Sequence, residues 1–123
     1  PLIGGATLTV AALLAVLLVP HSPSGRHGVG RESEVWIWGG EVVLILNESI
    51  DGWLLDDLRR LQVRNIDLLV SGGDPVNEAA RLRGRFGVDT TAPLTDAAVH
   101  WAIDGVVLII EMGEIGASGR IAP

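Results

Sequence analysis

The sequence predicts an α/β protein in which one transmembrane helix precedes a small domain of β-β-α-β-α-β order that ends in a β-hairpin. Three observations lead to this prediction. The eighteen residues after Pro1 carry no charge. Continuously apolar runs then alternate with amphipathic stretches that begin at good helix caps, the order expected of a sheet covered by helices. Finally, an Asp-Gly pair separates two apolar runs near the C-terminus, which is a strong hairpin signal.

The apolar run Leu2–Val19 predicts a transmembrane helix within residues 1–20. At a rise of ~1.5 Å per residue, a helix of this length just crosses a ~30 Å hydrocarbon layer. The alternative is a cleaved signal peptide, which requires a basic stretch before its apolar core, whereas the first basic side chain here is Arg26. Because the chain begins with Pro rather than Met, we expect this helix to be the last of a larger, truncated membrane bundle.

Composition divides the remainder into a linker, residues 21–33, a domain, residues 34–113, and a flexible tail, residues 114–123. The linker begins with a Pro-, Ser- and Gly-rich stretch, in which His21 and His27 are too isolated to form a metal site. The net charge is −6, with nine arginines and no lysine, which disfavours a broad basic surface for nucleic acid. The sequence contains no cysteine, which excludes disulfides and thiolate metal sites.

Two strands and a helix open the predicted domain. Glu34–Trp38 and the apolar Glu41–Leu46 predict a hairpin around Gly39 and Gly40, with the second strand buried on both faces. An amphipathic helix follows over Ile50–Leu61. Its N-cap is one of three residues that qualify by type: Asn47, Ser49 and Asp51.

A second helix is expected between two further strands. Ile66–Val70 predicts a buried strand, and Val88–Ala92 predicts a shorter one. Between them, Pro75–Phe86 predicts a helix with Asp74 as its N-cap and proline at its first position. Gly87 would end that helix. The passage from strand through helix to strand predicts at least one right-handed crossover.

The domain closes with a predicted hairpin. Its strands are Val99–Ile103 and Val106–Met112, and Asp104 and Gly105 form its turn. The sheet upstream should carry any ligand site in the loops at the carboxyl ends of its strands. The loop that follows the strand Ile66–Val70 is therefore the first candidate for such a site.

Ser71–Pro75 is that loop, and it allows an anion-binding interpretation. Ser71, Gly72 and Gly73 would let the backbone approach an anion at the start of the following helix. The carboxylate of Asp74 opposes this interpretation, because it occupies the place where a phosphate would bind.

A metal site is the other interpretation of the same region. It would use Asp74, Asp51 or His100. Hard divalent ions need several convergent oxygen or imidazole ligands, whereas these residues are scattered among predicted turns and caps. No serine of the domain has a neighbouring histidine that would activate it as a nucleophile.

Together these features resemble the C-terminal part of ComEC-type competence proteins, which are multi-spanning channels of bacterial DNA uptake. Many members carry a metallo-β-lactamase-like domain after their last membrane helices, in which a helix and a strand lead into the metal-binding loop. The resemblance covers residues 34–93 and the membrane segment, and it implies a domain that resembles part of that fold. Nine residues keep the family's pattern before the loop: Leu58, Leu61, Val63, Ile66, Asp67, Leu68, Leu69, Val70 and Ser71.

The loop itself departs from the family. Gly72 stands where the family has its first histidine, and Asp74 falls at the next ligand position. Val76 and Asn77 replace the remaining aspartate and histidine. Zinc-type catalysis needs three or more fixed ligands and an open position for water. The resemblance therefore implies a degenerate metal loop, no cofactor and no catalysis.

Three functions follow as hypotheses. The first is a non-catalytic domain of a ComEC-like DNA-uptake protein, tethered to the bacterial cell membrane, with the lipid bilayer and other parts of the channel as partners. The second is a metal-dependent nuclease or hydrolase, as in intact family members. The third is a single-pass membrane protein whose domain binds a partner or a nucleotide through Ser71–Pro75.

Direct binding of nucleic acid by this segment is not expected. Arg81, Arg83 and Arg85 alternate along one predicted helix, which would spread them around it rather than gather them on one face. The resemblance places the domain on the outer face of the membrane, whereas the arginines that follow the apolar run favour the cytoplasm.

Overall fold

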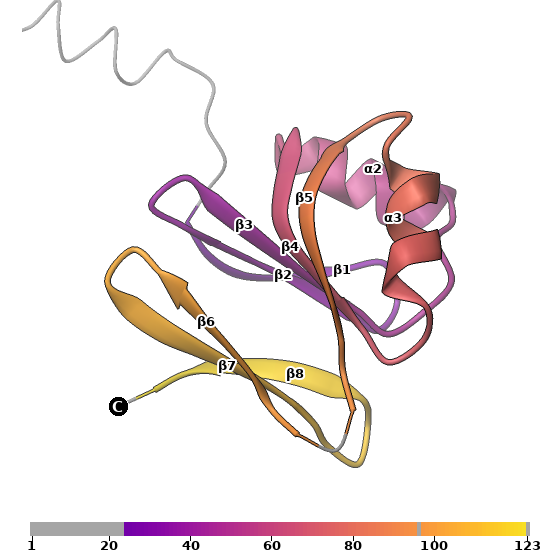
Figure 1. Ribbon diagram of the computed structural model, residues 1–123. Coiled ribbons are helices and arrows are strands. Elements are labelled where there is room, and N and C mark those ends of the chain that lie inside the picture. The colour runs from indigo at the N-terminus through magenta and orange to yellow at the C-terminus, as the bar shows by residue number, and fades with distance from the viewer. Residues whose placement is uncertain (1–23, 96, 123) are drawn as a thin grey trace, which may run out of the picture.

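The computed structural model describes residues 24–95 and 97–122. This part of the chain has a mixed α/β fold with two helices and eight strands, and the strands form two sheets (Figure 1). The helices cover one face of the five-stranded sheet, and the three-stranded sheet packs against its other face. The predicted α/β class is confirmed at this level.

The predicted transmembrane segment, Leu2–Val19, and His21 lie outside the described residues. Within residues 24–95 and 97–122, no helix has both the length and the apolar character needed to cross a bilayer.

The larger sheet and its helical cover consist of β1 (Gly25–Val29), β2 (Ser33–Trp38), β3 (Glu41–Leu46), α2 (Gly52–Arg60), β4 (Asn65–Ser71), α3 (Pro75–Leu82) and β5 (Gly87–Pro93). The strands lie in the order β1-β2-β3-β4-β5. The β1–β2 and β2–β3 pairs are antiparallel, whereas β3–β4 and β4–β5 are parallel. The two helices connect the parallel pairs, so the carboxyl ends of β3, β4 and β5 share one end of the sheet.

β3 is buried on both faces, as its continuous apolar run predicts. Val42, Leu44 and Leu46 join the core beneath the helices. Val43 and Ile45 join the core between the two sheets. Because neighbouring residues of a strand point to opposite faces, only a run without polar residues supplies both cores.

The second sheet contains β6 (Val99–Ile103), β7 (Val106–Met112) and β8 (Ala117–Ile121), paired antiparallel in that order. The Asp-Gly turn is confirmed, because Asp104 and Gly105 have φ values of 47° and 82°. A two-residue hairpin turn of this type needs positive φ at both central positions. Leu108 and Ile110 of β7 are fully buried between the sheets.

Each helix begins at an aspartate cap. Asp74 Oδ1 accepts a hydrogen bond from the backbone N–H of Asn77 at 3.2 Å, which confirms Asp74 as the N-cap of α3. Among the three candidates for α2, the cap is Asp51, whose Oδ1 accepts from the N–H of Leu54 at 2.9 Å. These bonds satisfy N–H groups that have no partner inside the helix.

α3 ends at Leu82, and the predicted end at Phe86 is wrong. The backbone N–H groups of Arg85 and Phe86 both donate to the carbonyl of Leu82 at 2.9 Å, which folds the chain into a turn. The turn buries the Phe86 ring in the core beneath the helices. Gly87 therefore starts β5 instead of ending a helix.

The predicted linker, residues 21–33, is corrected in its second half, because Gly25–Val29 forms the edge strand β1. Long-range contacts hold the turn that follows this strand. The backbone N–H of Arg31 donates to both carboxylate oxygens of Glu48, at 3.0 and 2.9 Å. The N–H of Gly30 donates to Asp57 Oδ2 at 2.9 Å. The polar, Gly-rich segment Gly25–Val29 is thus held as a strand with the help of Glu48 and Asp57, which lie far from it in the sequence.

The predicted flexible tail, residues 114–123, is corrected too, because it contains β8. Two polar side chains from the larger sheet bind this strand. The Asn47 side chain pairs with the backbone of Ala117, and the buried carboxylate of Glu34 accepts from the N–H of Gly119 at 2.8 Å. Glu34 also pairs with the guanidinium of Arg26 on β1.

Candidate functional site

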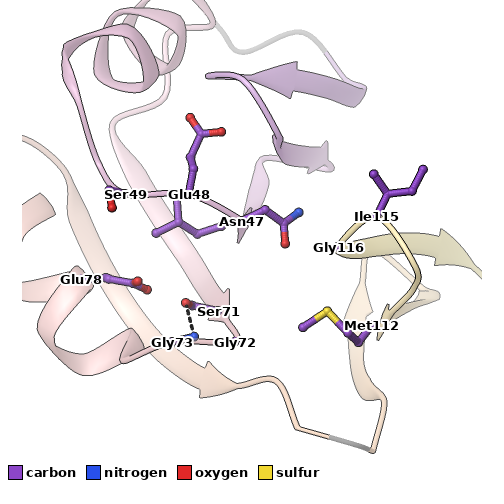
Figure 2. A pocket seen from close by; sticks show the side chains of 11 residues that line it. Asn47, Glu48, Ser49, Ser71, Gly72, Gly73, Glu78, Met112, Ile115 and Gly116 are labelled. Atoms are coloured by element: carbon purple, nitrogen blue, oxygen red, sulfur yellow. Dashed lines mark hydrogen bonds between the residues drawn. The ribbon is translucent and has the colours of Figure 1, made fainter.

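A cavity of about 460 Å³ opens at the carboxyl ends of β3 and β4 (Figure 2). Residues 46–49 and 71–73, at the ends of these two strands, form one side of it. Glu78 of α3 lines it from the helical layer. Met112, at the end of β7, and Ile115 and Gly116, in the β7–β8 turn, line it from the second sheet. The cavity therefore lies where loops from parallel strands meet, the usual place for ligand sites in such sheets.

The floor of the cavity is polar. Ser71 is buried at the end of β4, and its Oγ accepts a hydrogen bond from the N–H of Gly73 at 3.0 Å. Figure 2 shows Ser49 and Glu78 facing the same space as Ser71. Because the Ser71 hydroxyl accepts from Gly73, its own proton remains able to donate to a bound group.

Glu78 is the most unusual group at this site. Its Oε2 is fully buried and has no hydrogen-bond partner among the described residues. A Cβ added at Gly73 would lie 3.3 Å from Glu78 Oε1, so glycine at this position leaves room for the carboxylate. A buried carboxylate oxygen without a donor favours a ligand that supplies one, above all a cation.

The mouth of the cavity is apolar. Met112 is 52% exposed, and Ile115, in the turn between β7 and β8, is 98% exposed. A Cβ added at Gly72 would lie 3.1 Å from the terminal methyl group of Met112, so this side chain lies close over the glycine. An apolar rim around a polar floor suits a ligand that has a charged head and an apolar body.

The other polar lining residues have structural roles. Asn47 binds the backbone of β8, and Glu48 binds the turn after β1. Their side chains fix the wall of the cavity. Ser49, Ser71 and Glu78 are therefore the lining groups that none of these contacts occupies fully.

The structure brings together the residues of the predicted anion-binding loop, since Ser71, Gly72 and Gly73 all line the cavity. Their surroundings are less suited to an anion. The N–H of Gly73 already donates to Ser71, and the carboxylate of Glu78 lies beside the same loop. A negative ligand would meet a negative side chain at close range.

The four positions of the predicted degenerate metal loop do not converge on the cavity. Gly72 lines it, whereas Asp74, Val76 and Asn77 are exposed at the start of α3. Asp74 is occupied as a helix cap, and the Val76 side chain is 65% exposed.

The scattered candidates for a metal site remain apart as well. Asp51 caps α2, and His100 lies on β6 in the second sheet. In the part of the chain that the structure describes, no group of three His, Cys, Asp or Glu residues is arranged to hold a metal ion.

The sequence does not single out Glu78, because a charged residue in the first turn of a helix is ordinarily exposed. One feature of the sequence could have pointed to Glu78 as a site residue. Glu78 follows Asp74 by one helical turn, so both carboxylates lie on the side of α3 that begins at the loop.

Comparison with known proteins found no matching family model, no matching curated protein and no matching solved structure.

Proposed function

We propose that this chain is a non-catalytic, membrane-tethered α/β domain of a ComEC-like DNA-uptake protein, in which the metal loop has become a capped structural loop. The observation that carries the proposal is the position of Asp74. This residue is the one ligand-type side chain that the resemblance retains, and its carboxylate caps α3. Val76 and Asn77, at the other ligand positions, offer neither carboxylate nor imidazole.

The segment that carries the family resemblance supports the proposal by its placement. Leu58 of α2 and Ile66 and Leu69 of β4 are fully buried in the core beneath the helices. They lead directly into the loop at Ser71, at the carboxyl end of a parallel strand. A helix and a strand thus approach a loop whose own residues are adapted to capping and packing.

Elemental analysis and a nuclease assay test the absence of catalysis. The full chain, purified in detergent and dialysed against zinc and manganese ions, should carry no stoichiometric metal. Its activity on single- and double-stranded DNA should equal that of a blank preparation, with and without a chelator. Stoichiometric metal together with chelator-sensitive cleavage would establish the metal-dependent nuclease instead.

A second candidate function is binding of a partner through the cavity. It is favoured because Glu78 Oε2 has no hydrogen-bond partner within residues 24–95 and 97–122. The ligand class is an alkylammonium or guanidinium group with an apolar neighbour, because the floor is acidic and the rim is apolar. Titration with an arginine-containing peptide amide tests this function. Binding should disappear in Glu78→Gln and persist in Glu114→Gln, a change in the β7–β8 turn outside this cavity.

A further inference from the structure

Arginines gather at the end of the domain opposite to the cavity. Arg81 lies in the last turn of α3, and Arg83 and Arg85 lie in the turn that follows, because the helix ends at Leu82. The predicted helix, which runs to Phe86, would spread these side chains around its axis. The observed turn instead concentrates them near the amino ends of β4 and β5.

Arg64 joins this group from the neighbouring loop. Its carbonyl accepts a hydrogen bond from the N–H of Gly87 at 2.9 Å, so the α2–β4 and α3–β5 connections lie side by side. We name the group formed by Arg64, Arg81, Arg83 and Arg85 the arginine surface; all four residues are exposed. None of them forms an ion pair within residues 24–95 and 97–122.

Acidic side chains share this end of the sheet: Glu41 begins β3, and Asp67 and Asp89 accept hydrogen bonds from neutral donors. Asp89 Oδ2 accepts from the side-chain amide of Asn65 at 2.9 Å, and Asp67 Oδ2 accepts from the N–H of Val42 at 2.7 Å. The arginine surface also lies at the C-terminal end of α3, where the helix dipole favours positive charge. The arginine surface therefore places four exposed arginines on a chain whose net charge is −6, and one of them, Arg83, also donates to the carbonyl of Val88 at 3.5 Å.

The described chain begins at this same end of the sheet. Gly25, the first residue of β1, pairs with Ile37 of β2, and Ile37 pairs with Val42 near the start of β3. β4 and β5 run parallel to β3, so their first residues also lie at this end. Figure 1 shows the start of β1 beside the β2–β3 hairpin, with the α3–β5 turn across the twisted sheet from it. With neighbouring strands ~4.8 Å apart, β1 and β5 are separated by roughly 20 Å.

The sequence limits how far the start of β1 can lie from the membrane. Only residues 20–24 lie between the apolar run Leu2–Val19 and the first strand. Five residues span at most about 18 Å when fully extended. With the apolar run in the bilayer, as proposed above, the start of β1 cannot lie farther than this from the lipid headgroups.

From this geometry we infer that the arginine surface docks on anionic lipid headgroups of the bilayer that holds the tether. This inference rests on the proposed membrane tether. Guanidinium groups bind phosphodiesters through paired N–H donors, and each arginine near an anionic surface favours the docked state about fivefold. The net negative charge of the chain disfavours docking by its other faces.

Fluorescence quenching in vesicles tests the docking. The chain contains no cysteine, so a single label can be placed at Gly84→Cys, which lies between Arg83 and Arg85 with open space around it. The matched label is Ile115→Cys, in the exposed β7–β8 turn at the cavity end. The full chain is reconstituted in phosphatidylcholine vesicles, with or without an equal part of phosphatidylglycerol, that carry a headgroup-linked quencher.

We expect the label at position 84 to be quenched more than the label at 115 in phosphatidylglycerol vesicles, and this difference to shrink in added salt. Arg85→Gln should reduce the quenching, whereas Arg120→Gln, an equal charge change on β8, should not. Equal quenching at both positions, or equal effects of the two arginine changes, would overturn the inference.

Two further outcomes separate the inference from its premises. Release of the chain from neutral vesicles by an alkaline wash would refute the tether, whereas a retained chain with no lipid-dependent quenching would refute only the docking. A DNA oligonucleotide that binds the reconstituted chain in an Arg85-dependent manner, without any effect of phosphatidylglycerol, would assign the arginine surface to nucleic acid and overturn the docking.

Discussion

The side chain of Asn47 pairs with the backbone of Ala117 as a neighbouring strand would. Asn47 Nδ2 donates to the Ala117 carbonyl at 2.8 Å, and the Ala117 N–H donates to Asn47 Oδ1 at 2.9 Å. This amide joins the end of β3 to the first residue of β8 and therefore connects the two sheets. The same residue lines the cavity, so the connection also fixes the position of the cavity wall.

Asn47→Ala should lower the free energy of unfolding by about 2 kcal/mol, because it leaves the N–H and carbonyl of the buried Ala117 without partners. Chemical denaturation measures this loss, and hydrogen exchange should show reduced protection in β8 before other strands. Asn77→Ala, at an exposed asparagine, is the control and should change stability little. Equal losses in the two variants would contradict the proposed role of Asn47.

Gly119→Ala should also destabilise the contact between the sheets. The added methyl group would lie 2.7 Å from Trp36 Nε1 and 3.1 Å from the terminal methyl groups of Ile45 and Leu108, all in a packed core. We expect a loss of about 1–3 kcal/mol and a shift in tryptophan fluorescence, since such overpacking moves buried side chains.

Gly28→Ala is the matched control for Gly119→Ala, because a methyl group at Gly28 meets no atom within 4 Å. It should leave both the unfolding free energy and the fluorescence close to those of the unchanged chain. If the two alanine variants were equally stable, the close packing of β8 against Trp36 would be wrong.

Asp74→Ala should cost about 1 kcal/mol of stability, because it removes the side-chain acceptor that caps α3. Asp74→Asn should cost much less, since asparagine caps a helix nearly as well as aspartate does. Thermal unfolding followed by circular dichroism compares the two variants. A large loss in Asp74→Asn would mean that the negative charge, rather than the cap, is what the fold needs.

The elements that the sequence predicted are those whose signal is local. β3 and the β6–β7 hairpin follow from apolar runs and an Asp-Gly turn, and the cap of α3 follows from Asp74 before a proline. Each of these features depends on neighbouring residues alone. The bounds of β3, β6 and β7 therefore agree with the prediction residue by residue.

The elements that the prediction missed depend on distant partners. β1 and β8 contain few large apolar residues, so the alternating burial along each strand has little apolar signal in the sequence. They are ordered by Glu48, Glu34 and Asn47, which lie far from them in sequence. For the candidate site, the loop at Ser71 could be predicted from its place after a buried strand. Glu78 could not, because its burial depends on how α3 packs beside that loop.

Thermal unfolding of the full chain with zinc or manganese ions, compared with unfolding in a chelator, tests the central claim most directly. A metal held by the folded state at one hundred times its dissociation constant would stabilise it by about 2.7 kcal/mol, which is a readily measured rise in the unfolding midpoint. If Asp74 is a cap in a loop without metal, the unfolding midpoint of the unchanged chain is the same with metal and with chelator. The midpoint of Asp74→Asn is likewise the same in the two conditions. A metal-dependent rise that Asp74→Asn abolishes would contradict the account.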